Sequence, residues 1–250
     1  MADVVLSVLA HPDDAEFLCA GTLFRLTREQ GWQIHIASMT PGDCGSVEHG
    51  PEEIARIRRA EGVRAAALLD AAYHCLEERD LLIFYHERPL ERITHLLRAV
   101  RPRIVLTHSP ADYMLDHEMT SALVRAAVFG APAPNFFADR GHPPALGYIP
   151  HLYYCDAIEG KDAMGRPIEP GFRIDIGTAL ETKAAMLAAH VSQRDWLLKH
   201  HGMDHYVQSM RDWSAQRGRQ AGVAFAEGFR QHLGHGYPQD NLLGQLLGVC

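Results

Sequence analysis

The sequence lacks the positive charge, long apolar runs and leader segment that mark several classes of protein. Its 250 residues carry 24 Lys and Arg against 31 Asp and Glu, a formal net charge of −7. Nucleic-acid-binding proteins normally present a basic face, so this balance argues against that class. No apolar run is long enough to span a bilayer, and the first residues lack the basic and apolar regions of a signal peptide. We therefore expect a cytoplasmic protein that binds neither nucleic acid nor membrane.

The cysteines and glycines also lack the spacing of common sites. The five cysteines, at positions 19, 44, 75, 155 and 250, form neither a CxxC pair nor a zinc-finger pattern. The glycine-rich segment 40–46 contains neither GxGxxG nor a GK[ST] ending, so its signal for nucleotide binding is weak. With 47% hydrophobic residues and no internal repeat or linker, the sequence predicts a single domain over residues 1–250.

Strand-like and helix-like segments alternate along the chain, which predicts an α/β fold with a mostly parallel sheet flanked by helices. The expected strands cover residues 4–9, 33–39, 72–76, 103–107, 151–156 and 172–176. The expected helices cover residues 17–30, 52–69, 87–100, 118–129, 178–201 and 203–233, the last with an interruption near Gly218 and Gly222. An apolar tail follows at 242–247 and is expected to pack on the domain or on a neighbouring subunit. Ligands of such sheets bind at the carboxyl ends of the strands, so an active site is expected there.

The segment 10–16, AHPDDAE, follows the first expected strand and is rich in polar and ionisable side chains. Pro12 stiffens the turn, so that His11 and Asp14 can bend back toward one point while Asp13 projects elsewhere. A histidine nitrogen and a carboxylate oxygen are zinc-type ligands, and a free carboxylate beside bound water suits a general base. A second interpretation is that both acids cap the following helix and that His11 is an ordinary loop residue. A helix cap needs only one acid, so the presence of a second acid favours the interpretation as a site.

A second polar cluster, HSPADYMLDH at residues 108–117, follows the strand expected at 103–107. Asp116 could instead be a helix cap, and His108 a hydrogen-bonded loop histidine. Because both clusters follow strands of one sheet, they are expected to lie at the same edge. A shared site is therefore the favoured interpretation.

Six motifs together resemble the LmbE/PIG-L family of zinc-dependent deacetylases of N-acetylated amino sugars. In family order they are HPDDAE at 11–16, TPGD at 40–43, RRAE at 58–61, DH at 116–117, Lys183 with HVSQ at 190–193, and AEGF at 226–229. The resemblance covers nearly the whole chain and implies a Rossmann-like fold. Oligomers are common among family members, so the resemblance, together with the apolar tail, predicts a homo-oligomer.

The resemblance implies a role for individual residues. His11, Asp14 and His117 would hold the metal, and Asp13 would be the general base. Arg58 and His190 would contact an N-acylated, sugar-like substrate. Zn²⁺ is the expected ion, and Fe²⁺ also suits two histidines and a carboxylate. A bound metal would lower the pKa of water to roughly 7, which makes hydroxide available at neutral pH.

One position departs from the family pattern. Many members have HPDH where this chain has Met114-Leu115-Asp116-His117. The first histidine of that motif is thought to be an acid or an oxyanion donor, and a methionine side chain can donate neither proton nor hydrogen bond. The candidates to replace it are His108, Tyr113, His151 and His190.

Three functions are consistent with these residues. The first is metal-dependent removal of an N-acetyl or related acyl group from an amino sugar or its conjugate. The second is a metal-dependent hydratase or lyase acting on a small unsaturated carboxylic acid, as in one relative of the family, for which an arginine cluster would be needed. The third, a non-catalytic sugar-binding protein, is disfavoured by the intact His11, Asp13, Asp14 and His117. The sequence does not name the substrate.

Overall fold

The computed structural model describes residues 2–201 and 205–250. Its strands are β1 (Val4–Leu9), β2 (Gln33–Ser38), β3 (Ala72–Cys75), β4 (Ile104–Thr107), β5 (His151–Cys155), β6 (Phe172–Asp175) and β7 (Ala226–Gln231). They form one seven-stranded sheet in the order β3-β2-β1-β4-β5-β7-β6. Every described pairing from β3 to β5 is parallel, and β7 runs antiparallel to both β5 and β6. The prediction of a mostly parallel α/β sheet is confirmed.

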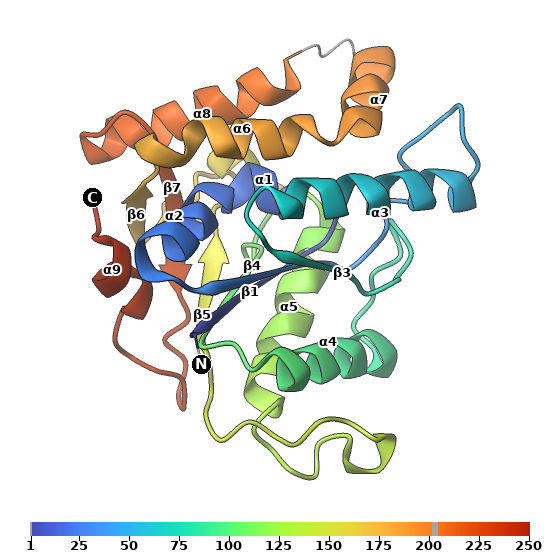
Figure 1. The fold of residues 1–250 in the computed structure, drawn as a ribbon, viewed down its shortest axis with the longest axis vertical. Coiled ribbons are helices and arrows are strands. Elements are labelled where there is room, and N and C mark those ends of the chain that lie inside the picture. Colours follow the sequence, from blue (N-terminus) through green and yellow to red (C-terminus); the bar gives the residue numbers. More distant parts are fainter. Residues whose placement is uncertain (1, 202–204) are drawn as a thin grey trace.

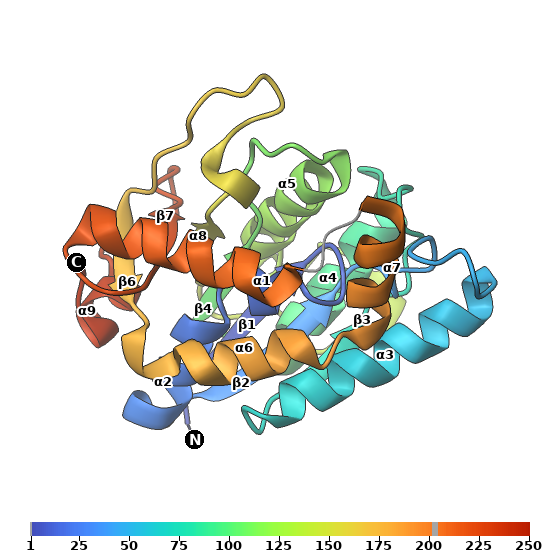
Figure 2. The ribbon, with the colours of Figure 1, turned by 90° about the horizontal axis from the view of Figure 1, so that it is seen from above.

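The described helices cover both faces of this sheet. They are α1 (Asp14–Leu18), α2 (Ala20–Gln30), α3 (Pro51–Ala67), α4 (Glu87–Val100), α5 (Leu115–Gly130), α6 (Leu180–Ala188), α7 (Val191–His201), α8 (Tyr206–Ala221) and α9 (Leu242–Leu247). Helices α4 and α5 lie on one face, while α1, α2, α3, α6 and α8 lie on the other (Figure 1). Viewed from above, α6 and α8 run side by side over that second face (Figure 2). Each layer buries its own apolar core against the sheet.

The strand order places the two polar clusters at one point. The chain builds β1, β2 and β3 toward one edge of the sheet and then returns to place β4 on the other side of β1. Loops after β1 and β4 therefore diverge at the carboxyl ends of two neighbouring strands. Such a switch point leaves a crevice in which α/β proteins bind their ligands.

Several helix boundaries differ from the sequence-based prediction. The helix expected at 17–30 begins earlier, at Asp14, and breaks at Cys19 into α1 and α2. The helix expected at 178–201 breaks between Ala188 and Val191. The helix expected at 118–129 begins at Leu115, after the extended residue Met114, so the second cluster lies partly in a helical turn.

The region expected to be helical at 203–233 contains a strand. Residues 203 and 204 lie outside the described residues. Helix α8 ends where Gly222 adopts a left-handed conformation (φ 74°), which confirms the interruption expected near that residue, and the chain then enters the sheet as β7. The prediction of helix over 226–231 is therefore wrong. The segment 226–229 is fully buried between two strands, and this tertiary burial overrides the local helical pattern.

The apolar tail forms α9 and packs on the domain itself. Leu243 and Leu247 are buried in the core beneath α2, and the backbone N–H of Leu243 donates to the Tyr153 hydroxyl at 3.0 Å. Among the described residues, no helix combines the length and apolarity needed to cross a bilayer.

The strand β7 brings a carboxylate into the core between α2 and α6. Glu227 accepts hydrogen bonds from the backbone N–H groups of Gly21 (2.9 Å) and Thr22 (2.7 Å) and from Lys183 Nζ (2.6 Å). The side chains of Lys183 and Glu227 are 1% and 2% exposed. Because neither charge can reach water, removing one partner leaves the other uncompensated.

We expect Lys183→Met to lower the free energy of unfolding by about 3–5 kcal/mol, the usual effect of leaving one charge of a buried pair unpaired. Urea denaturation followed by circular dichroism measures the change. The matched control is Lys199→Met, which removes the lysine of an exposed pair with Glu48 and should change stability little. Equal losses in the two variants would show that the buried pair is unimportant for stability.

Candidate metal centre and active-site pocket

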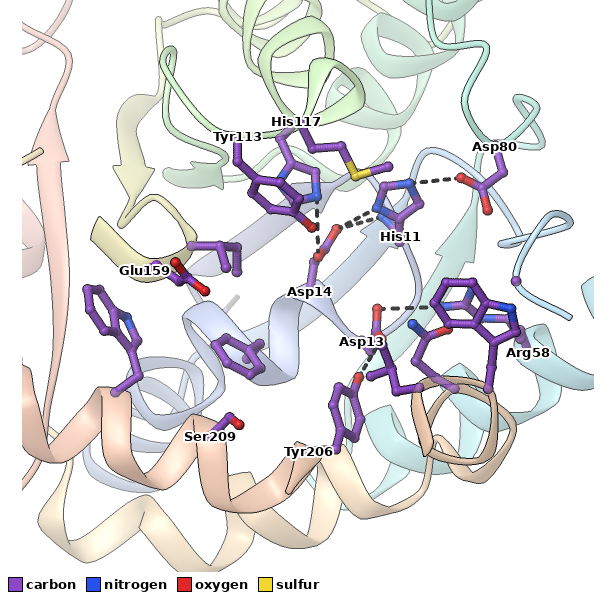
Figure 3. Close-up of a pocket in the computed structure, with 18 of the residues that line it drawn as sticks. His11, Asp13, Asp14, Arg58, Asp80, Tyr113, His117, Glu159, Tyr206 and Ser209 are labelled. Carbon is purple, nitrogen blue, oxygen red and sulfur yellow. Dashed lines mark hydrogen bonds and ion pairs between the residues drawn. The ribbon is translucent and has the colours of Figure 1, made fainter. Parts of the chain in front are cut away.

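Three side chains from the two clusters converge at the carboxyl end of the sheet. A ring nitrogen of His11, a ring nitrogen of His117 and a carboxylate oxygen of Asp14 all lie within 4.8 Å of one another. Asp14 Oδ2 is 3.3 Å from His11 Nδ1, and Asp14 Oδ1 is 3.7 Å from His117 Nε2 (Figure 3). Two imidazoles and one carboxylate fit a divalent metal and leave coordination positions for water or substrate.

Local structure explains why these three atoms meet. The N–H of His11 donates to Asp14 Oδ2 at 2.7 Å, which closes the loop after β1 back on itself. Asp14 begins α1, whereas His117 lies in the first turn of α5. The early start of α5 therefore turns His117 inward toward Asp14.

Further carboxylates face the outer nitrogens of both histidines. His117 Nδ1 lies 3.0 Å from Asp112 Oδ1. His11 Nε2 lies 3.0 Å from Asp80 Oδ1 and 3.4 Å from Asp116 Oδ2. A carboxylate on the far nitrogen fixes the ring orientation and makes the imidazole a better metal ligand.

The charge state of Asp14 suits a ligand. Burial opposes its ionisation, but His117, His108 and His11 outweigh that effect and hold its pKa well below the usual range. His108 itself is fully buried and stacks on the ring of His117 at 3.9 Å. Burial, together with His117, lowers the pKa of His108 to about 4, so this ring is neutral at physiological pH.

Other residues of the region could also group around an ion. The further sets are His108 with Asp112 and His117, His11 with Asp80 and Asp116, and Asp43 with Cys44 and Asp80. Each shares a residue with another set, so the acidic and imidazole groups form one continuous cluster around the crevice. Within the described part of the chain, Asp13 belongs to none of these sets.

Asp13 lies beside the cluster and is held by different partners. Its backbone is left-handed (φ 111°), which turns its side chain away from that of Asp14. Asp13 Oδ1 is 3.6 Å from Arg58 Nη2, and Oδ2 accepts a hydrogen bond from the Tyr206 hydroxyl (Figure 3). Burial raises the pKa of Asp13, while the charge of Arg58 opposes that rise.

Arg58 joins the two loops that frame the site. From α3, its guanidinium donates to the carbonyl oxygens of Pro12 (3.0 Å) and Gly42 (3.4 Å). Gly42 has a left-handed backbone (φ 72°), and a side chain there would collide with the guanidinium. The TPGD loop therefore requires glycine at this position. Arg58 also lines the pocket, so its expected substrate contact is sterically open.

A pocket of about 820 Å³ opens over the cluster. Close to the three central side chains it is lined by Asp13, Cys44, Arg58, Asp80, Tyr113 and Met114. It continues along α7 and α8, where its wall includes Gln193, Trp196, Tyr206, Ser209, Asp212, Trp213 and Arg219. His190, expected to contact substrate, is not among the lining residues; its ring is buried with Nε2 3.4 Å from Glu16 Oε1.

Some residues of the site escaped the sequence analysis. Asp112, Asp80 and Tyr206 each hold a residue of the site, yet none was identified from the sequence as having a role. Asp112 carried a usable signal, because an acid five residues before the candidate ligand His117 can reach its ring. Tyr206 carried none, since 193 residues separate it from Asp13.

Comparison with known proteins identifies relatives of this arrangement. The sequence pattern of the PIG-L family, GlcNAc-PI de-N-acetylase, matches residues 6–128. The chain is 28% identical over 241 residues to diacetylchitobiose deacetylase of Thermococcus kodakarensis, covering 90% of this chain and 82% of that protein. It is also 28% identical over 157 residues to 4-oxalmesaconate hydratase of Pseudomonas putida, covering 58% of this chain and 60% of that protein.

A solved structure shares the fold. The N,N′-diacetylchitobiose deacetylase of Pyrococcus horikoshii superimposes with a TM-score of 0.78 at 26% sequence identity. The superposition covers 96% of this chain and 89% of the other. The seven-stranded sheet and its flanking helices therefore belong to an architecture that is already known from a deacetylase.

We expect His117→Ala to lose most of its bound divalent metal, because removing one of three ligands leaves a weak site. Metal content of the purified protein, measured by plasma mass spectrometry, gives the result. The control is His151→Ala, whose ring pairs with Asp240 outside the pocket and should leave metal content unchanged. One full equivalent of metal in His117→Ala would exclude His117 from the ligands.

Proposed function

We propose that the protein, which matches the PIG-L family over residues 6–128, is a zinc-dependent hydrolase that removes an N-acetyl or related acyl group from an amino sugar or amino-sugar conjugate. The observation that carries this proposal is the adjacency of Asp13 to the His11–Asp14–His117 cluster. A carboxylate that faces the pocket without joining the cluster is what general-base hydrolysis requires. The deacetylases among the relatives support the choice of substrate.

His11, Asp14 and His117 are the residues that would hold the metal. When bound, the ion supplies acidified water and a Lewis acid for the acyl carbonyl. Zinc is proposed because two imidazoles and one carboxylate are a frequent catalytic zinc set, and ferrous iron fits the same donors. Asp112 and Asp80 keep the two imidazoles in position.

Asp13 acts as the base that accepts a proton from the attacking water. Its hydrogen bond from Tyr206 and its contact with Arg58 fix its direction, and its left-handed backbone keeps it apart from the ligands. Burial raises its pKa, which strengthens the carboxylate as a proton acceptor. The departing amine then carries the proton away.

Tyr113 supplies the hydrogen-bond donor that Met114 cannot. Met114 lines the pocket at the position of the expected histidine, and the neighbouring Tyr113 lies edge-on to His117 with ring centroids 5.5 Å apart. Partial burial and the carboxylates of Asp14 and Asp112 raise the pKa of Tyr113, so its hydroxyl keeps its proton. The other candidates, His108, His151 and His190, do not line the pocket.

The hydratase alternative lacks the arginine cluster that a dicarboxylic acid would need. Among the described residues that line the pocket, the arginines are Arg58 and Arg219. Arg58 comes from α3, whereas Arg219 lies at the far end of α8, so the two come from different elements and are not neighbours in one cluster. The deacylation reaction needs no such cluster, so it is the function we propose.

The zinc-loaded protein should release acetate and a free amine from N-acetylated amino sugars, and chelation should abolish the release. In Asp13→Asn we expect kcat to fall by a factor of roughly 10²–10⁴ with metal content and KM nearly unchanged, because an amide can hydrogen-bond water but cannot take its proton.

Loss of metal in Asp13→Asn would instead make Asp13 a ligand. Full activity would place the base elsewhere. The control is Asp139→Asn, an acid on the exposed segment after α5, which should match wild type in both measurements.

In Tyr113→Phe we expect kcat to fall by a factor of roughly 10²–10³, the usual effect of removing one oxyanion donor, with metal content unchanged. Steady-state kinetics of acetate release measures it. Phenylalanine keeps the ring over His117, so a loss reports on the hydroxyl alone. Wild-type kcat in this variant would assign the donor to another group.

A further inference from the structure

One side of the pocket is polar and carries two buried atoms that call for a ligand. Among the described residues, neither Arg58 Nε nor Gln193 Oε1 has a hydrogen-bond partner, although both atoms are buried. Their side chains meet at Gly45, where a Cβ would lie 2.7 Å from Arg58 Nη1 and 3.4 Å from Gln193 Oε1. All three residues line the pocket. A buried donor beside a buried acceptor fits the hydroxyl groups of a sugar, which accept and donate hydrogen bonds.

The opposite side of the pocket is lined by apolar side chains. Figure 3 shows Glu159 and Ser209 on the side of the pocket away from Arg58. Ile158 directly precedes Glu159, and Trp213 follows Ser209 by about one turn of α8. The side chains of Ile158 and Trp213 are partly buried, and both line the pocket.

Phe17 extends the apolar side to the candidate metal ligands. It lies in α1 three residues after Asp14, so the two side chains share one side of that helix. Phe17 lines the pocket, and it packs with Ile158 against one core cluster. We name Phe17, Ile158 and Trp213 the apolar groove. The groove therefore begins beside Asp14, where the acyl carbonyl would stand in the proposed reaction.

Contacts behind Trp213 hold the far end of the groove in place. The Arg217 guanidinium lies 4.4 Å from the centroid of the indole ring, and Arg217 Nη2 donates to Asp156 Oδ1 at 3.0 Å. The indole also packs on the short 3₁₀ segment η2 (Ile158–Gly160) between β5 and β6, since a Cβ on Gly160 would lie 2.6 Å from Trp213 Cη2. The indole is thus positioned before any ligand arrives, which lowers the entropic cost of binding.

The polar side chains near the groove remain in contact with water. Four of them line the pocket and are exposed: Glu159, Asp212, Gln216 and Arg219. Because water can reach these groups, a ligand does not have to satisfy their hydrogen bonds. The partly buried surface that a ligand would cover is that of the three apolar side chains. A hydrocarbon chain is the chemical group that gains most from such a surface.

The two sides of the pocket orient the substrate of the proposed reaction. With the sugar at Arg58 and Gln193 and the scissile carbonyl at the His11–Asp14–His117 cluster, the chain beyond the carbonyl points toward the apolar groove. We propose that the groove binds the hydrocarbon chain of an N-acyl group longer than acetyl. The preferred substrates are thus amino sugars that carry a linear N-acyl chain of medium length. This inference rests on the proposed function for its reaction.

The longer chain changes the affinity and leaves the chemistry as it is for acetyl. The hydroxide part of water adds to the carbonyl carbon, the C–N bond breaks and the nitrogen takes up the proton, so the products are a carboxylic acid and a free amine. Each methylene that the groove removes from water adds about 0.8 kcal/mol of binding free energy, which is about fourfold in affinity. We therefore expect kcat/KM to increase with the length of chain that the groove covers.

The test compares N-acetyl-, N-butanoyl- and N-hexanoylglucosamine as substrates of the zinc-loaded enzyme, with release of glucosamine as the common measurement. We expect kcat/KM to rise at each step and to be at least about 10-fold higher for the N-hexanoyl than for the N-acetyl compound. Equal values for the three compounds, or a fall with chain length, would overturn the proposal.

A matched pair of variants tests the groove itself. Ile158→Thr makes its wall polar, and we expect the ratio of kcat/KM for N-hexanoyl- over N-acetylglucosamine to fall several-fold. The control is Val207→Thr, because Val207 lies on α8 and packs against the same core cluster but does not line the pocket. That variant should keep the wild-type ratio. A wild-type ratio in Ile158→Thr, or an equal fall in both variants, would contradict a role for the groove.

A second compound tests which end of the substrate the groove takes. The hexyl glycoside of N-acetylglucosamine carries the same chain on the sugar, so the chain reaches the pocket from the amine side of the amide. We expect its kcat/KM to stay close to that of N-acetylglucosamine. A value as high as that of N-hexanoylglucosamine would assign the groove to the sugar substituent and overturn the proposal.

Binding separates the groove from the reaction. In calorimetric titrations of Asp13→Asn, N-hexanoylglucosamine should bind at least about 10-fold more tightly than N-acetylglucosamine. If this difference holds and the wild-type enzyme releases no amine from any of the compounds, the proposed reaction is wrong and the groove stands. If N-acetylglucosamine is hydrolysed and the difference is absent, the reaction stands and the groove is wrong.

Discussion

The Glu227 carboxylate links the core to the loop after β1, which carries His11, Asp13 and Asp14. Its three donors come from two helices, since Gly21 and Thr22 lie in the first turn of α2 and Lys183 lies in α6. Gly21 also has to be glycine, because a Cβ there would lie 2.7 Å from Ile176 Cγ2. The position of α2 fixes α1 through the short break at Cys19, and α1 begins at Asp14, the carboxylate proposed to bind the metal. A charge pair in the core thus helps to position the carboxylate of Asp14.

The local pattern of apolar and polar residues was enough to predict much of this architecture. Glu87–Val100 shows both boundaries of a helix as its sequence predicts, because its apolar residues recur at helical spacing and Pro102 follows it. The strand Val4–Leu9 could also be predicted, because an apolar segment rich in valine favours a buried strand. The convergence of His11, Asp14 and His117 followed from parallel strands sharing one edge. Their identity as ligands remains a prediction, although the geometry is compatible with it.

The parts that could not be predicted depend on contacts distant in sequence. Strand β7 follows a helix without a distinct strand pattern, and only its place between β5 and β6 makes residues 226–229 extended. Tyr206 reaches Asp13 from the last long helix, and Asp80 reaches His11 from the loop after β3. Nothing in the sequence distinguishes Trp213 from other helix residues, because its contacts with Arg217 and Gly160 form only in the folded protein.

The backbone of Asp13 restricts how this protein can evolve. At φ 111° a side chain is tolerated mainly when it is short and polar, as in aspartate or asparagine, or absent, as in glycine. Mutations to longer or β-branched residues meet steric strain before their chemistry can be selected. Because Asp13 and Asp14 are consecutive, a backbone change that relieved the strain would also move Asp14. Substitutions at position 13 are therefore restricted by the backbone as well as by the chemistry of the side chain.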